Sequence, residues 1–287
     1  MFAPLAAGFS LVSTSLTSGS RQETPKRGLP NPITFLEQYF GSGIKLCGLT
    51  IIVLWKTWSL ILRGKIDWAE TIRQCEMIGL KSSLVVGITA LFTGFAMSLQ
   101  VARELVLFGA DTAIGGVVSL ALIREIGPIT AGVTVAGRVA SSIAAELTTM
   151  MITEQIDALS VMRIDPIEFL VVPRYLAAII MLPVLSVYAM FIGLVAGINI
   201  AYFAANLPVA TFLDSVKQTI LDRDFFVHFL KAFINGTIIA SFACSIGLST
   251  RGGAEDVGIA TTRSIVWTMT MIFVFNFLVT SLTYAPR

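Results

Sequence analysis

Two charged residues, Arg124 and Glu125, stand side by side within a long apolar segment, residues 112–145. On a helix, adjacent side chains point about 100° apart and cannot pair as i,i+4 neighbours do. Each charge costs about 2.5–3.5 kcal/mol at the centre of a membrane helix unless it faces protein or water. Pro128 follows closely, and a proline removes a backbone hydrogen bond and bends a helix. These residues predict a broken helix that lines a polar pocket within a membrane; the alternative is a pair that snorkels to the interface.

The short segment 153–163, which reads TEQIDALSVMR, is the second candidate for a functional element. Its apolar residues recur at helical spacing, and its acids lie in the first turns, where they suit the helix dipole. We expect Thr153 to be its N-cap, Arg163 to lie in its last turn, and Pro166 to end it. A helix of about ten residues is too short to cross a membrane. Periodicity alone indicates an ordinary amphipathic connector; the functional interpretation is a coupling helix docked on a cytoplasmic motor subunit.

Residues for enzyme chemistry are few. His228 is the single histidine, and Cys47, Cys75 and Cys244 are scattered without a CxxC motif. This pattern indicates neither a disulfide framework nor a metal site. A Ser-His or Cys-His pair would have to use His228, which lies among the charges of residues 214–231 and is expected to be a solvated loop histidine. We therefore expect no catalytic residues.

Nucleotide binding is not indicated either. Residues 41–45 (GSGIK) and 79–82 (GLKS) contain glycine and lysine, but neither matches the GxxxxGK[ST] loop. If the protein uses ATP, another chain must bind and hydrolyse it, and no cofactor of its own is expected. The basic residues do not gather into a nucleic-acid footprint, so no nucleic-acid partner is expected.

The elements that hold these residues follow from composition. Of 287 residues, 55% are hydrophobic and 13% charged, and the mean hydropathy is +0.82. Soluble domains carry about a quarter charged residues, so this chain belongs in a bilayer. Long charge-free runs indicate helices rather than a barrel, and the fold class is all-α and polytopic. Five transmembrane helices are predicted, at about residues 80–103, 112–148, 167–205, 228–250 and 261–284.

The N-terminal part is expected to stay outside these spans. Residues 1–30 are predicted to be a disordered tail or a weak targeting segment. Residues 32–65 are basic and flanked by tryptophans, which predicts a helix lying in the membrane interface; the alternative is a poor sixth span. Up to Lys81 there are nine Lys/Arg and five acids, so the positive-inside rule places the N-terminus in the cytoplasm. Five crossings then place residues 149–166 inside and residues 214–231 outside.

Several short motifs follow one another in an order that is specific when taken together. They are LIREIGP (122–128), AGR (136–138), Ala145-Glu146, TEQIDAL (153–159), Met162, Asp165-Pro166, VPR (172–174) and GIATTR (258–263). In order and spacing they resemble the MlaE family of ABC-transporter permeases, and the resemblance covers about residues 35–284. One departure is Asn276, which precedes Phe277 where the family often has an aspartate.

The resemblance implies a permease domain, residues 31–287, that moves phospholipids or related lipids. Its implied partners are an ABC ATPase subunit, an MCE-domain lipid-binding protein, a second copy of itself and membrane lipids. It selects the coupling-helix interpretation, with ATPase contacts at Glu154, Gln155, Asp157, Ala158, Leu159 and Met162. It also places Arg124, Glu125 and Pro128 at a lipid cavity.

The implied location is a bacterial inner membrane, or alternatively a plastid inner envelope. Two other functions are kept as alternatives. An ion-coupled secondary transporter would show an internal repeat, and none is found. An integral membrane enzyme that modifies lipids would need clustered nucleophile, base or metal residues.

Overall fold

The computed structural model describes residues 32–64 and 66–284, with side chains from residue 43 onward. The predicted tail or targeting segment, residues 1–30, lies outside the described residues. By its contacts the chain divides into two units, Met1–Lys45 and Leu46–Arg287. The arrangement described below is that of the second unit.

Every regular element in the described residues is helical. Four short stretches are π-helical: η1 (Glu76–Leu80), η3 (Leu122–Ile126), η4 (Ala136–Ala140) and η5 (Ile167–Val171). The α-helices are α2 (Pro32–Leu62), α3 (Trp68–Cys75), α4 (Lys81–Leu107), α5 (Ile114–Ala121), α6 (Gly127–Val135), α7 (Ser141–Ile152), α8 (Gln155–Val161), α9 (Val172–Ala205), α10 (Val209–Thr219), α11 (Asp222–Ser249) and α12 (Ala254–Tyr284). A 3₁₀ turn, η2 (Asp111–Ala113), precedes α5.

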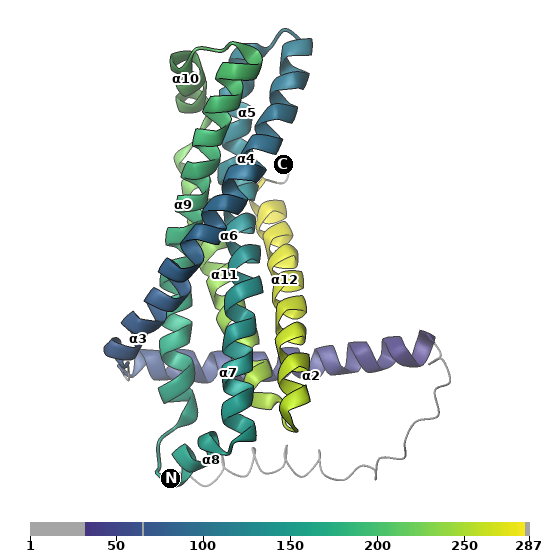
Figure 1. Cartoon of the computed structure of the whole chain (residues 1–287), viewed down its shortest axis with the longest axis vertical. Coiled ribbons are helices and arrows are strands. Elements are labelled where there is room, and N and C mark those ends of the chain that lie inside the picture. The colour runs from purple at the N-terminus through teal and green to yellow at the C-terminus, as the bar shows by residue number, and fades with distance from the viewer. Residues whose placement is uncertain (1–31, 65, 285–287) are drawn as a thin grey trace. The chain divides into compact units, whose positions relative to one another are not determined.

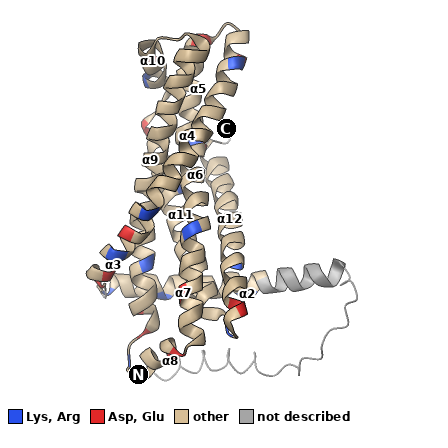
Figure 2. Ribbon diagram, viewed as in Figure 1, with Lys and Arg blue, Asp and Glu red and all other residues tan. Residues whose placement is uncertain are grey.

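In the part of the chain that the structure describes, six helical runs are long and apolar enough to cross a membrane, which makes the chain a polytopic membrane protein. They are Gly43–Leu62, Trp68–Leu107, Asp111–Ile152, Ile167–Ala205, Asp222–Ser249 and Ala254–Tyr284. Figure 2 shows the long uncharged stretches of ribbon that make up most of these runs. The additional run, compared with the five predicted spans, is the one within α2.

The part of α2 from Leu46 onward runs crosswise to α7, α9 and α12 (Figure 1). Lys56 on this part pairs with Asp165 at 2.8 Å, and the Trp58 ring packs edge-on against Tyr175 with centroids 6.4 Å apart. A helix at this angle to spanning helices suits a membrane surface. The interfacial placement of α2 therefore stays our prediction, although its length and composition would also allow a span.

The predicted break at Pro128 is wrong. The run Asp111–Ile152 is continuously helical, and Pro128 lies in the first turn of α6, directly after η3. A proline is tolerated at this position because Lys231 Nζ donates to Arg124 O, the oxygen that the missing N–H would otherwise bond. The helix therefore stays continuous while its backbone bonding changes locally.

Close packing between helices depends on small residues. A Cβ added at Gly94 of α4 would lie 2.8 Å from the Cα of Gly193 on α9, so the two backbones are in direct contact. Small residues allow such approach in membrane bundles. Of the apolar window of α11, 72% is buried, against 17% for α12. The core is thus built around α11, and α12 keeps most of its surface open.

Candidate functional site

The site is built on one face of α11. Asp224, His228, Lys231 and Asn235 recur at spacings of four, three and four residues, which places them on one side of a helix. Each is at most 2% exposed. All four reach the segment that begins with η3. A polar face on the most buried helix therefore meets the adjacent charges Arg124 and Glu125.

Arg124 is held by Asp224. Its Nε donates to Asp224 Oδ1 at 2.8 Å and its Nη2 donates to Oδ2 at 3.3 Å. The Tyr284 hydroxyl donates to the same carboxylate at 2.7 Å, and the guanidinium lies 4.3 Å from the centre of the Tyr284 ring. Bidentate pairing and a cation–π contact fix the guanidinium while part of it stays accessible.

Glu125 is held by three donors from two helices. Lys231 Nζ donates to Glu125 Oε1 at 2.8 Å, and the Thr280 hydroxyl donates to the same oxygen at 2.6 Å. Asn276 Nδ2 donates to Oε2 at 2.5 Å. An aspartate at position 276 would place a second carboxylate against Glu125, whereas the asparagine supplies a hydrogen. We call Arg124, Glu125, Asp224, Lys231, Asn276, Thr280 and Tyr284 the charged network.

The helix change at η3 frees two carbonyl groups, and α11 fills both. The Gly127 N–H donates to Leu122 O, one residue further back than in an α-helix, which leaves Ile123 O without its usual partner. His228 Nδ1 lies 2.8 Å from this oxygen. Pro128 has no N–H for Arg124 O, and Lys231 Nζ donates to it at 2.6 Å. Buried carbonyls need donors, so these bonds stabilise the π turn.

His228 is therefore not the solvated loop histidine that the sequence predicted. It is fully buried, and its Nε2 lies 2.8 Å from the hydroxyl of Ser186, which is also fully buried. Because a carbonyl can only accept, Nδ1 must carry the proton. The Ser-His pair has no opening to a substrate, and its Nδ1 faces a carbonyl instead of an orienting acid. Among the described residues no His, Cys, Asp and Glu side chains gather as a metal site needs.

The expectation that residues 214–231 form a loop is also wrong, because Val209–Thr219 form α10 and only two residues separate it from α11. α11 begins at Asp222, so Asp224 and Lys231 lie within the helix rather than in solvent. Charge density suggested a loop, but Asp224 and Lys231 each pair with an opposite charge on η3. The recurrence of polar residues on one face of residues 224–235 is the signal that could have revealed a buried polar face.

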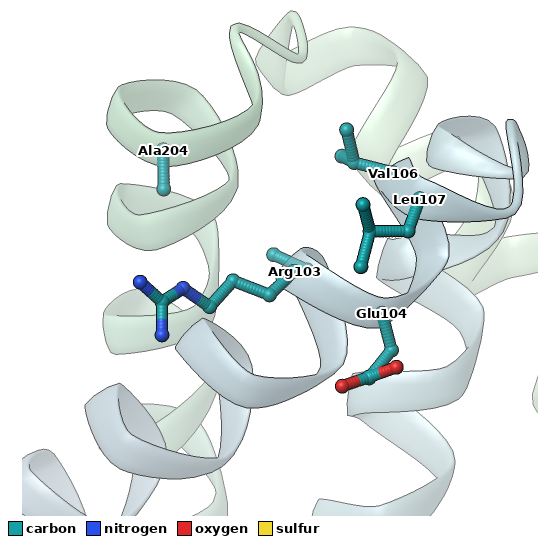
Figure 3. A pocket seen from close by; sticks show the side chains of 6 residues that line it. Arg103, Glu104, Val106, Leu107 and Ala204 are labelled. Carbon is teal, nitrogen blue, oxygen red and sulfur yellow. The ribbon is translucent and has the colours of Figure 1, made fainter.

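The predicted cavity residues lie together, but they differ in exposure. The side chains of Arg124 and Glu125 are 30% and 36% exposed, whereas Pro128 is buried. A hollow of about 390 Å³ lies elsewhere, at the end of α4 beside α9, and is lined by Ala102, Arg103, Glu104, Val106, Leu107 and Ala204. Figure 3 shows Arg103 reaching toward the α9 side and Glu104 pointing the other way.

The predicted coupling helix is α8, which is shorter than expected. Thr153 is not its N-cap: it ends α7, and its hydroxyl donates to Thr149 O. Glu154 and Arg163, which flank α8, both have left-handed backbone conformations, so Arg163 lies beyond the last turn. The acids favour a helix start, but here the chain must reverse sharply after α7.

α8 leaves most of its surface open. Ile156 is buried at 6% exposure and anchors the helix. Leu159 is half-buried, and the other predicted contact residues are exposed, namely Glu154, Gln155, Asp157, Ala158 and Met162. Val161 is 84% exposed. Acidic and apolar side chains thus project together from one short, anchored helix.

These features define a polytopic membrane protein with a charged network inside its helical bundle and an exposed short helix between two spans. The family described as Permease MlaE matches residues 71–282. The chain belongs to this family of membrane permeases.

Individual relatives are similar over most of the chain. A probable ABC transporter permease protein of Synechocystis sp. is 43% identical over 224 residues, covering 78% of this chain and 85% of the relative. A probable ABC transporter permease protein of Rickettsia conorii is 39% identical over 226 residues, covering 79% and 87%. The protein TRIGALACTOSYLDIACYLGLYCEROL 1, chloroplastic, of Arabidopsis thaliana is 36% identical over 221 residues, covering 77% of this chain and 63% of the relative.

Proposed function

We propose that this chain is the membrane subunit of an ABC transporter that moves phospholipids or related lipids. The observation that carries the proposal is the match to the MlaE permease family over residues 71–282. Relatives named as ABC transporter permeases support a separate ATPase subunit, which binds and hydrolyses the ATP. The chloroplast relative is named after a glycolipid, which supports a lipid as cargo.

In this proposal α8 is the contact with the ATPase. Its exposed acids, Glu154 and Asp157, and its exposed apolar residues, Val161 and Met162, offer both charge and apolar surface to a partner. The buried Ile156 ties α8 to the bundle, so displacement of α8 is passed to α7. Coupling requires that α8 makes different contacts in the two nucleotide states of the ATPase.

The lipid path in this proposal passes Arg124 and Glu125. Both side chains keep an accessible edge although their charges are balanced, so the network offers hydrogen bonds without an uncompensated charge. Pro128 supports the path indirectly, through the carbonyl that it leaves for Lys231. A second copy of the chain would close the cavity, and an MCE-domain protein would exchange lipid with it. We place the complex in a bacterial inner membrane, with a plastid inner envelope as the alternative.

Reversing the two acids of α8 tests the assignment. Glu154→Lys with Asp157→Lys should abolish co-purification of the ATPase and ATP-dependent transfer of a fluorescent phospholipid between proteoliposomes, while membrane insertion is unchanged. The matched control is Glu104→Lys with Asp214→Lys, because both acids are exposed and lie outside α8. If the α8 variant still co-purifies with the ATPase and still couples ATP hydrolysis to lipid transfer, the proposal is contradicted.

A further inference from the structure

Two arginines among the described residues of the bundle lack the carboxylate partner that the other interior basic side chains have. Five basic side chains in the described residues are buried or half-buried. Three have a carboxylate partner at 2.8 Å: Arg124 with Asp224, Arg174 with Glu146, and Lys231 with Glu125. Arg138 and Arg263 have none among the described residues. A basic side chain inside a membrane protein needs an anion or water as a partner. Each of these two arginines could therefore bind an anion that does not belong to the described part of the chain.

Arg138 differs from Arg263 because its guanidinium is fixed. Its Nη1 donates to Ser82 Oγ at 2.5 Å and to Met77 O at 3.3 Å. Met77 O is free to accept because the Lys81 N–H bonds to Glu76 O, as a π turn requires. The arginine therefore occupies a position that the register change at η1 creates.

The remaining edge of this guanidinium is open. Nε and Nη2 carry three N–H groups, and none has a partner among the described residues. Neither nitrogen is completely buried. The Nε–Nη2 edge is the one that binds two oxygens of a carboxylate or phosphate side by side. The two hydrogen bonds of Nη1 fix the guanidinium, so that its Nε–Nη2 edge is oriented to bind an anion.

A second cation lies at the same junction. Lys81 is exposed, and its Nζ lies 3.3 Å from Met77 Sδ, which is a weak acceptor. Ser82 then begins the charge-free run of 21 residues that ends at Ala102. Arg138 and Lys81 both contact Met77, and they do so where a charged segment gives way to an apolar one. Lipid phosphates lie at such a boundary in a bilayer.

We propose that Arg138 and Lys81, with Ser82 holding the guanidinium, bind the phosphate group of a membrane phospholipid. This inference rests on the proposed function and adds a headgroup site separate from the charged network. A phosphate supplies the missing negative charge and two oxygens for the open edge. A lipid with only hydroxyl groups supplies no charge. Free phosphate has the same chemistry without the acyl chains, and the experiment must separate the two.

The test uses the full chain, stripped of lipid in detergent, with three probes: dioleoyl phosphatidic acid, dioleoylglycerol and inorganic phosphate. Arg138→Gln should weaken phosphatidic acid binding about tenfold, as expected for loss of a charge-assisted hydrogen bond. Arg138→Lys should bind phosphatidic acid more tightly than Arg138→Gln but less tightly than the unmodified chain. Lysine keeps the positive charge but cannot donate two parallel hydrogen bonds as a guanidinium does. Lys217→Gln removes an exposed charge on α10 and should bind like the unmodified chain.

The outcomes separate this site from a structural role. Dioleoylglycerol should bind equally to all four proteins, and inorganic phosphate should not displace phosphatidic acid. If Arg138→Gln weakens both lipids alike, the arginine only holds η1, and the proposal is overturned. If inorganic phosphate displaces phosphatidic acid, the site binds a free anion rather than a lipid headgroup, and the proposal is also overturned. Unchanged phosphatidic acid binding by Arg138→Gln defeats this inference alone, whereas absence of lipid binding by every protein defeats the proposed function.

Discussion

Lys231 shows how one side chain can satisfy several demands of a membrane helix. It is 1% exposed and donates to Glu125 Oε1, to Arg124 O and to Thr280 Oγ1 at 2.6–2.8 Å. An ammonium group has three hydrogens, so each finds an acceptor. The lysine neutralises a carboxylate and also replaces the N–H that Pro128 lacks. The lysine therefore balances the charge of Glu125 and completes the backbone hydrogen bonding at Pro128 with the same ammonium group.

Replacing Lys231 should destabilise the fold. Lys231→Met leaves Glu125 without its counter-charge and Arg124 O without a donor, which should cost about 3–5 kcal/mol. A lowered midpoint of thermal unfolding in detergent would measure this. Adding Glu125→Gln should restore part of the loss, because no charge then stays unpaired. Lys217→Met is the control, and equal stability of Lys231→Met and the control would contradict the prediction.

The site could be predicted from the sequence only in part. Arg124, Glu125 and Pro128 stand out because charges and proline are rare in apolar runs. Their partners did not, because Asp224 and Lys231 lie 100 or more positions away and sit near a charged turn. Charge density marks loops in soluble proteins, but in a bundle it also marks buried pairs. Only the helical recurrence of those residues distinguishes the two cases.

At the scale of elements, the contact between α4 and α9 should be sensitive to a single methyl group. Gly94→Ala places a Cβ 2.8 Å from Gly193 Cα, and backbone cannot yield as a side chain can. We expect a loss of about 1–3 kcal/mol from overpacking. Gly258→Ala on α12 meets nothing within 4 Å and should gain up to about 1 kcal/mol from helix propensity. Chemical denaturation in mild detergent compares them, and a Gly94→Ala protein as stable as Gly258→Ala would refute the contact.

The short helix α8 illustrates a limit of local patterns. Its existence could be predicted from apolar spacing, but its ends could not. Thr153 and Arg163 looked like cap and last-turn residues, yet the tertiary path of the chain places left-handed residues at both ends. Non-glycine residues adopt that conformation only where the surrounding structure demands it. Periodicity could not assign a role to α8 either, and the coupling interpretation came from the resemblance, with support from the predicted topology.

For the whole molecule, composition was the most informative property. Long charge-free runs were sufficient to predict a polytopic helical protein, because a bilayer tolerates few other folds. The ends of the runs were harder to predict: the second run starts at Trp68, where residue 80 was expected. Helices that continue into polar surroundings lose the compositional signal. For α2, length and hydropathy permit two placements, and its basic residues, its flanking tryptophans and its crosswise orientation favour the interface.

Orientation can be tested by accessibility of single cysteines. In a chain with Cys47, Cys75 and Cys244 replaced by serine, Met162→Cys should react with an impermeant maleimide only from the cytoplasmic side. Phe108→Cys should react only from the opposite side, because one span separates the N-terminal region from residue 108. Both side chains are well exposed, at 62% and 79%, so reactivity reports sidedness rather than burial. Labelling of both from one side would contradict the predicted topology.

The π turns have a consequence for how the long helix tolerates change in length. A π turn contains about one residue more than an α turn, so η3 acts as a one-residue insertion in the run Asp111–Ile152. Each residue rotates the helix by about 100°. The wide turn absorbs this rotation, so loss of one residue at η3 would restore a plain α-helix and leave Arg138 on the same side of the helix. Loss of one residue within α6 has no wide turn to absorb it and would rotate Arg138 away from α4. A related chain with a one-residue alignment gap at η3 would therefore keep the binding face, whereas a gap within α6 would signal a rotated one.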